Sequence, residues 1–309
     1  MKGNVTKAHN VVRALLDRHG ESTARVERVI HLSDGLHRSG YGVIVSGASR
    51  IPEQVVVLIP RRGRSGEVQS SWEREIGVLR SLERSCRDID FPKIIGVEWD
   101  DGLPILVVSF VAGLAFGPHG VLRDPVRYLE SVARVASVVH RLPIDEFRAA
   151  LSGATTYREF AMSLLSRFKM HSDPDIGRAL AWCLERMPGE EPSVVVHGDL
   201  LGQNILLSSD NESRLAVIDW SECCLGDPAY EFAVVTRGVR NPWKVPEGRK
   251  RLLALYKNSG GLSVSIERVL FYETILVMAW LAHYLEREPS SGDVGEERRR
   301  LATVIAGFR

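Results

Sequence analysis

Three polar residues stand at the ends of short apolar segments in the second half of the chain. Asp199 and Asn204 are five positions apart in HGDLLGQN, and Asp219 follows the apolar segment LAVI one expected hairpin later. Phosphoryl transfer needs such a set, because one carboxylate must orient the attacking hydroxyl group and accept its proton, while an amide and a second carboxylate hold magnesium on a triphosphate. Few protein ligands suffice for Mg²⁺, since phosphates and water complete its octahedron. The spacing therefore predicts magnesium-dependent phosphoryl transfer.

The same three residues also have a plain structural interpretation. In it, Asp199 and Asn204 shape a turn and Asp219 caps a strand. A single Asp beside Gly favours that interpretation, whereas three such residues with this spacing around a hairpin favour chemistry.

The motifs around these residues resemble a known family. HGDLLGQN, followed by VIDW and GDP, is similar to the signature of the aminoglycoside phosphotransferase family, relatives of the eukaryotic protein kinases, and IDWSECCLGDPAYEFA resembles the hygromycin and macrolide phosphotransferases in particular. The resemblance implies a catalytic base at Asp199, magnesium ligands at Asn204 and Asp219, and ATP or GTP as co-substrate. It also implies structural support from His197, which an ordinary packed histidine would explain equally well, and from Asp227, whose place before a proline is typical of a helix N-cap.

The first part of the chain offers weaker signals for a nucleotide. Gly35 lies in SDGLHRSG (33–40), where the family has its phosphate-covering loop, although a plain hairpin turn explains these residues as well. Ser109, Phe110 and Val111 fall where the family's hinge offers backbone groups to the purine.

One position departs from the family pattern. The family has Lys or Arg on the third strand, two residues before a Pro, where it pairs with a helix Glu and the phosphates; here that position is Leu58, and Glu75 matches the helix Glu. Arg61 and Arg62 are possible substitutes only if the chain folds back. We expect instead that the site functions with magnesium and the loop backbone alone, because Pro60 stiffens the strand before those arginines.

Acceptor residues are harder to find in the sequence. Glu273, Trp280 and Tyr284 lie on one face of an expected helix over 267–286, and an acidic group among aromatic rings could hold a cationic or sugar-like ligand. A core helix with one internally paired Glu is the simpler interpretation. Glu231 is a further, weaker candidate.

The order of expected elements predicts an α+β, protein-kinase-like fold with two lobes. Strands are expected at 29–32, 41–46, 54–59, 93–99 and 104–110 with a helix over 70–84, which gives a small β-rich lobe over residues 1–110. Helices dominate residues 111–309, and a β-hairpin is embedded among them. A doubly wound sheet would alternate strands and helices instead.

Composition excludes several classes of protein. The 309 residues include 40 Lys and Arg against 39 Asp and Glu, a net charge of +1 that gives no electrostatic footprint for nucleic acid. The longest apolar stretches, 55–60 and 275–282, are too short for a bilayer span, and no secretory signal begins the chain. We expect a cytoplasmic enzyme, monomeric or homodimeric, that phosphorylates a hydroxyl group of an antibiotic-like small molecule of the aminoglycoside or macrolide type. The alternatives are a metabolite kinase for an amino alcohol or sugar, and a nucleotide-binding pseudokinase, suggested by Leu58.

Overall fold

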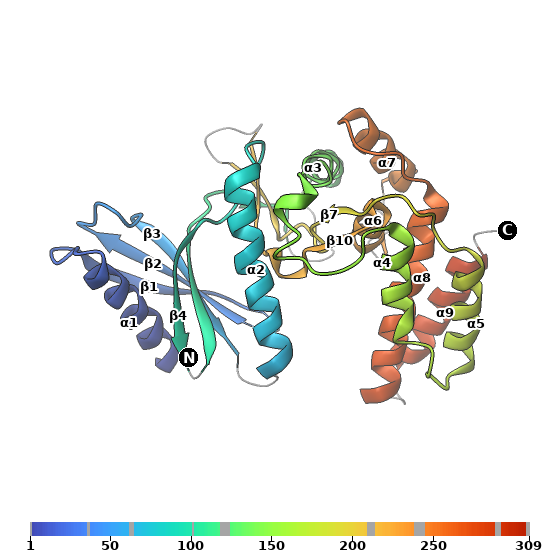
Figure 1. The fold of residues 1–309 in the computed structure, drawn as a ribbon, viewed down its shortest axis with the longest axis horizontal. Coiled ribbons are helices and arrows are strands. Elements are labelled where there is room, and N and C mark those ends of the chain that lie inside the picture. Colours follow the sequence, from blue (N-terminus) through green and yellow to red (C-terminus); the bar gives the residue numbers. More distant parts are fainter. Residues whose placement is uncertain are drawn as a thin grey trace.

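Apolar residues at alternate positions build the first lobe around a five-stranded antiparallel sheet. The computed structural model describes residues 2–35, 38–61, 65–100, 102–117, 124–208, 214–237, 245–287 and 292–306. The sheet has the order β1-β2-β3-β5-β4, with β1 at Arg25–Asp34, β2 at Arg38–Ser46, β3 at Gln54–Pro60, β4 at Ile94–Asp100 and β5 at Leu103–Ser109. Figure 1 shows it flanked by two helices, α1 (Lys2–Arg18) and α2 (Ser65–Ser85).

The two faces of the sheet belong to different cores. Tyr41, Val57 and Val107 point toward α1 and form one buried cluster with it. Residues one position away, such as Leu106 and Leu58, pack with α2 against the core of the second lobe. Because side chains alternate along a strand, every residue that faces α2 also faces the rest of the molecule. Any polar side chain on that face of the sheet therefore lies toward the junction of the lobes.

The second lobe is mainly helical, and several of its helices start at sequence-encoded caps. Asp124, Asp173 and Asp227 each accept a hydrogen bond from a backbone amide in the first turn of the helix that follows, and each helix has Pro at its start. The described helices are α3 (Pro125–Val139), α4 (Tyr157–Ser166), α5 (Pro174–Glu185), α6 (Pro228–Thr236), α7 (Gly248–Asn258), α8 (Ile266–Arg287) and α9 (Gly292–Ala306).

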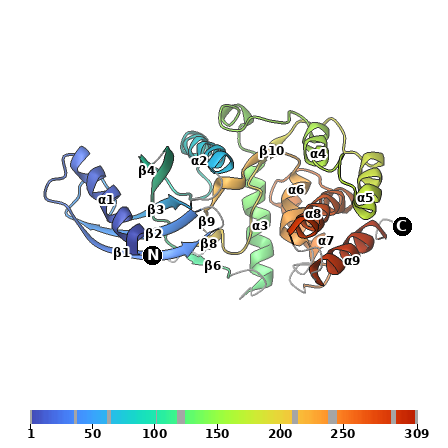
Figure 2. The same ribbon diagram turned by 90° about the horizontal axis from the view of Figure 1, so that it is seen from below.

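Short strands embedded among these helices lie beside α2 and α3 (Figure 2). They form a three-stranded sheet of order β6-β8-β9 and a β7-β10 pair. Their bounds are β6 Leu114–Ala115, β7 Val194–Val196, β8 Ile205–Leu207, β9 Leu215–Val217 and β10 Cys224–Gly226. The predicted hairpin over β8 and β9 is confirmed, although residues 209–213 of its connection are outside the described residues.

Helix α8 is long and apolar enough, by length and composition, to cross a membrane, which no other helix in the described ranges is. More than half of that segment is buried inside the protein, at 56%. Its buried side chains include Tyr272, Ile275 and Met278, which belong to the core of the second lobe. Packing against α5, α6 and α9 therefore accounts for its hydropathy.

The β-rich first part and helical second part agree with the sequence-based expectation. The bounds differ by a few residues, since β1 spans Arg25–Asp34 rather than 29–32 and α2 begins at Ser65 rather than at residue 70. The polar start of α1 carries little apolar periodicity, so its helical state depends on packing against β1 and β2.

Candidate active site

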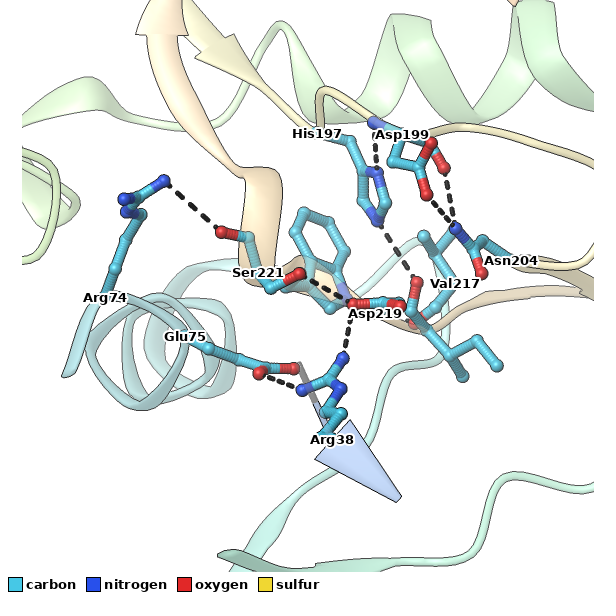
Figure 3. A network of polar contacts seen from close by, with 11 residues as sticks. Arg38, Arg74, Glu75, His197, Asp199, Asn204, Val217, Asp219 and Ser221 are labelled. Atoms are coloured by element: carbon cyan, nitrogen blue, oxygen red, sulfur yellow. Dashed lines mark hydrogen bonds and ion pairs between the residues drawn. The ribbon is translucent and has the colours of Figure 1, made fainter. Parts of the chain in front are cut away.

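The hairpin β8–β9 brings the three predicted phosphotransfer residues together. Ile205 pairs with Val217, and the amide of Ile218 donates to the carbonyl oxygen of Asn204 at 3.0 Å, so Asn204 and Asp219 lie at the same end of the hairpin. The Asn204 amide group, Nδ2, donates to Asp199 twice, to Oδ2 at 2.7 Å and to the backbone oxygen at 2.9 Å. Figure 3 shows Asp199, Asn204 and Asp219 in one network.

Asp199 has the electrostatic surroundings of a proton acceptor. Burial raises the pKa of its carboxyl group to about 7, the negative charge of Asp219 adds to the rise, and the hydrogen bond from Asn204 opposes it. A general base works best with a pKa near the operating pH. Geometry and pKa therefore give Asp199 the properties of the base that the sequence predicts.

His197 holds the loop that carries Asp199. Its Nδ1 accepts from the Asp199 amide at 3.1 Å and its Nε2 lies 3.2 Å from the Ile218 carbonyl oxygen, which requires a neutral ring with the proton on Nε2. Burial lowers the pKa of His197, which is consistent with the neutral form. The ring also packs edge-on against Trp220 at 4.6 Å between centroids. His197 thus joins the loop to the hairpin.

Glu231 supports the same loop from α6, and its carboxylate faces the protein interior. It is fully buried and accepts hydrogen bonds from the amides of His197, at 2.7 Å, and Gly198, at 3.2 Å. Burial acts to raise the pKa of Glu231, but His140, His197 and the Gly198 amide outweigh it and hold the pKa below its ordinary value. These contacts leave it unsuited to binding an acceptor, which corrects the sequence-based interpretation.

We expect Glu231→Gln to destabilise the protein by about 1–3 kcal/mol, because one buried acceptor oxygen becomes an NH₂ donor that faces a backbone N–H group, and the negative charge beside His140 and His197 is lost. Turnover should fall several-fold while KM for the acceptor stays unchanged. Thermal unfolding and steady-state kinetics test this, with the exposed Glu267→Gln as control, expected within about 0.5 kcal/mol of wild type. A raised acceptor KM with unchanged stability would return Glu231 to the acceptor site.

Gly198 sits in a backbone conformation that only glycine adopts easily. Its φ is +80°, and a Cβ at this position would lie 2.5 Å from the carbonyl oxygen of Glu222. We expect Gly198→Ala to cost about 1–3 kcal/mol of stability and to displace Asp199, with a loss of activity larger than the loss of folded protein explains. Ala at Gly177, where a Cβ meets nothing within 4 Å, is the matched control. Wild-type activity in folded Gly198→Ala would contradict this expectation.

A cation does pair with Glu75, and it comes from β2. The guanidinium of Arg38 contacts the Glu75 carboxylate through Nη1 and the Asp219 carboxylate through Nη2 (Figure 3). This corrects the expectation that Glu75 has no cationic partner in the absence of a cation at Leu58. Arg61 instead donates to the Gly35 carbonyl oxygen at 3.0 Å, and Arg62 lies outside the described residues.

Asp219 shows the backbone strain that is common at functional sites. Its φ is +63°, in the left-handed region that is costly for residues with a side chain. The hydroxyl group of Ser221 donates to its Oδ1 at 2.9 Å. The conformation directs its carboxylate toward Arg38, at the end of β9.

The donor set fits a magnesium ion. Asn204 and Asp219 offer hard oxygen atoms, and no group of three His, Cys, Asp or Glu side chains forms a metal cage within the described ranges. Mg²⁺ needs no such cage when phosphates and water supply its other ligands. The carboxylates of Glu75 and Asp219 both pair with the guanidinium of Arg38, so this cluster carries an excess of negative charge, which a divalent cation beside Asp219 would balance.

The other nucleotide candidates lie on the first lobe. Gly35 closes a β1–β2 hairpin, where its amide donates to the Arg38 carbonyl oxygen at 2.7 Å. At the end of β5, the amides of Ser109 and Phe110 donate to Lys93 and Gln54. Val111 follows the strand, and its amide makes no backbone–backbone hydrogen bond in the part of the chain that the structure describes. Its contact with a purine stays a prediction.

Of the predicted acceptor residues on α8, one is engaged internally. Glu273 is buried and accepts from Arg249 Nη2 at 2.7 Å, so the simpler interpretation of a core helix with a paired Glu holds for it. Trp280 is 40% exposed, stacks near Tyr284 at 6.0 Å, and lies under the guanidinium of Arg237 at 5.4 Å. The aromatic part of the predicted face is therefore the accessible part.

Asp227 caps α6 as its sequence predicts, and its second partner lies on α8. Its Oδ1 accepts from the Ala229 amide at 2.8 Å, and Arg268 Nε lies 3.2 Å from Oδ2 as an ion pair without hydrogen-bond geometry. Burial raises the pKa of Asp227 to about 6, and Arg268 opposes the rise. The side-chain hydrogen bonds to the loop at 197–198 come from Glu231, so Asp227 ties α6 to α8.

Sequence reasoning missed two arginines of this region, Arg38 and Arg237. Arg38 lies on the strand next to the one that holds Leu58, in SDGLHRSG, where only the glycines carried a signal for a nucleotide. Its position on the α2 side of β2 was available from the alternation of that strand. Arg237 follows α6 without any motif, and burial lowers its pKa while Tyr230 and Asp199 oppose the change. No local pattern distinguishes it from a surface arginine.

Solved structures share the fold of this chain. The chain superposes on macrolide 2'-phosphotransferase type I with a TM-score of 0.63 and 21% identity, over 99% of this chain and 97% of that one. It superposes on a thermostable mutant of aminoglycoside phosphotransferase APH(4)-Ia, in ternary complex with ADP and hygromycin B, with a TM-score of 0.61 and 17% identity over 95% and 97%. The predicted kinase-like fold with two lobes is confirmed.

The sequence matches place the chain within a family. Residues 31–264 match the phosphotransferase enzyme family, APH, and the chain belongs to it. It is 26% identical over 242 residues to an aminoglycoside 3'-phosphotransferase of Streptomyces fradiae, covering 75% of this chain and 88% of that protein. It is 35% identical over 153 residues to the viomycin phosphotransferase of Streptomyces vinaceus, covering 45% and 52%. The predicted enzyme class, a phosphotransferase with an alcohol group as acceptor, is confirmed.

Proposed function

We propose that this chain transfers the γ-phosphate of ATP or GTP to a hydroxyl group of an antibiotic-like small molecule, with Mg²⁺ as cofactor. The observation that carries the proposal is the convergence of Asp199, Asn204 and Asp219 at the mouth of the β8–β9 hairpin. We place the enzyme in the cytoplasm, where nucleoside triphosphates are available. Either a monomer or a homodimer is compatible with this chemistry.

The residues of the site have separate tasks in this reaction. Asp199 orients the acceptor hydroxyl group and accepts its proton, and its hydrogen bond from Asn204 keeps the carboxylate directed at that position. Asn204 and Asp219 would hold Mg²⁺, which supplies neutralisation of the charge on the phosphates. His197 and Glu231 keep the loop in place, so that the proton acceptor needs no rearrangement before transfer.

The acceptor class is supported by the relatives and limited by the site. The relatives are named for aminoglycoside and viomycin phosphorylation, and one structural neighbour for macrolides. Glu231 and Glu273, the acidic residues that would attract a polyamine, are both engaged inside the protein. Trp280 and Arg237 offer an aromatic ring and a positive charge instead. This favours an acceptor with apolar surface, of the macrolide type, over a densely cationic aminoglycoside.

A nucleotide-consumption screen tests the proposal. Purified protein is assayed with ATP and with GTP against aminoglycosides, macrolides, a viomycin-type peptide and small amino alcohols and sugars, with Mg²⁺ and with a chelator. We expect magnesium-dependent consumption that requires one of the antibiotics, and a phosphorylated product by mass spectrometry. Consumption with an amino alcohol or sugar alone would identify a metabolite kinase. Nucleotide binding without any product would identify a pseudokinase, although the main reason for that alternative is removed now that Arg38 pairs with Glu75.

A further inference from the structure

We infer that Arg38 is the phosphate-binding cation of this enzyme, supplied from β2 in place of the residue that is Leu58 on β3. The inference rests on the proposed function, since it assigns a residue to the nucleotide of that reaction. Three observations carry it: where Arg38 lies in the sheet, how its guanidinium is held, and how its two carboxylate partners differ.

The sheet register places Arg38 near Leu58, the position where the family has its strand cation. Arg38 pairs with Pro60 and Gly40 pairs with Leu58 across the β2–β3 ladder, so Arg38 and Leu58 are diagonal neighbours on the face that points toward α2. Such neighbours are about 7–8 Å apart, within reach of an arginine side chain. Gly40 has no side chain between them. A guanidinium from β2 thus reaches the same space as a cation from β3.

The Arg38 side chain is held in one orientation. It is 16% exposed, its guanidinium lies 5.7 Å from the centroid of the Trp72 ring, and Nη1 pairs with Glu75 on α2. Glu75 is itself only 5% exposed and cannot leave the pair without burying an unpaired charge. Glu75 therefore positions the guanidinium of Arg38, in the way that the family's helix Glu pairs with the cation on the third strand.

The second partner of Arg38 is of a different kind. Nη2 pairs with Asp219, whose side chain is 38% exposed and also accepts from Ser221. A guanidinium donates to carboxylate and phosphate oxygens with the same planar geometry. In this structure the Asp219 carboxylate pairs with the edge of the guanidinium that a phosphate group would take. Arg38 can exchange this partner and keep Glu75, which frees the Asp219 carboxylate for its role as a metal ligand.

A purely structural role for Arg38, tying the β1–β2 hairpin to α2, makes different predictions, and binding measurements separate the two. Calorimetry compares ADP with adenosine, and GDP with guanosine, in the presence of Mg²⁺. The variants are Arg38→Met and, because Glu75 would otherwise stay buried without a partner, the double variant Arg38→Met with Glu75→Gln. Of ADP and GDP, we take the one that wild type binds more tightly. We expect both variants to bind it roughly 10- to 100-fold more weakly than wild type does, while their affinity for the matching nucleoside is unchanged.

Two further variants complete the test. Leu58→Lys added to Arg38→Met returns a cation to the usual strand and should recover most of the lost diphosphate affinity. Arg28→Met removes an exposed arginine of the same sheet and should bind like wild type. Unchanged diphosphate affinity in the double variant, or an equal loss for diphosphate and nucleoside, would overturn the inference. Wild-type protein that binds neither ADP nor GDP would instead reject the proposed function, and the inference with it.

Discussion

Replacing Asp199 by Asn should lower turnover by about 10²–10⁴-fold, the contribution that a positioned general base typically makes. The substitution keeps the size of the side chain and removes only its capacity to accept a proton. The measurement is steady-state product formation with the acceptor that the nucleotide screen identifies. A variant that keeps more than roughly a tenth of wild-type turnover would exclude Asp199 as the base.

Folding and nucleotide binding should survive this change. Burial disfavours the charged carboxylate of Asp199, as its pKa of about 7 indicates, so a neutral amide at this position places no new cost on the folded state. Thermal unfolding and ADP calorimetry check both properties. Glu222→Gln is the matched control: it removes a negative charge that also raises the pKa of Asp199, from an exposed side chain, and should change turnover only a few-fold.

Replacing Asp219 by Ala should remove the magnesium dependence of nucleotide binding and lower turnover by roughly 10²-fold or more, because a bound metal contributes several kcal/mol of charge stabilisation in the transition state. Asp219 lies two residues after β9, at the same end of the hairpin as Asn204, where its carboxylate would hold a magnesium ion that also contacts the phosphates. Calorimetry of ADP with Mg²⁺ and with a chelator gives the direct measurement.

ADP binding measured with a chelator is the control for ADP binding measured with Mg²⁺. Without Mg²⁺, the variant should bind ADP at least as well as wild type, since the loss of Asp219 leaves Nη2 of Arg38 without its competing carboxylate. With Mg²⁺, the variant should lack the gain in affinity that wild type shows. An unchanged gain would exclude Asp219 as a magnesium ligand.

Local rules were enough to predict much of this molecule. The pattern of apolar residues located the strands of the five-stranded sheet and the embedded hairpin, and Asp227 before a proline marked the start of α6, because strand faces and helix caps depend on residues close in sequence. The candidate site of Asp199, Asn204 and Asp219 could also be predicted from the sequence. These residues span one loop and one hairpin, so their spacing nearly determines their distance.

The partners of buried charges were decided only by the tertiary structure. Arg38 is 181 positions from Asp219 and 37 from Glu75, and no periodicity links a β-hairpin to a helix of the same lobe and a strand end of the other. Glu231 was a weaker candidate for binding the acceptor, yet the packing of α6 beside the loop that carries Asp199 directs its carboxylate toward two backbone amides. The physical reason is the cost of burying an unpaired charge, which each site meets with whichever opposite charge or amide the packing of distant elements brings within reach.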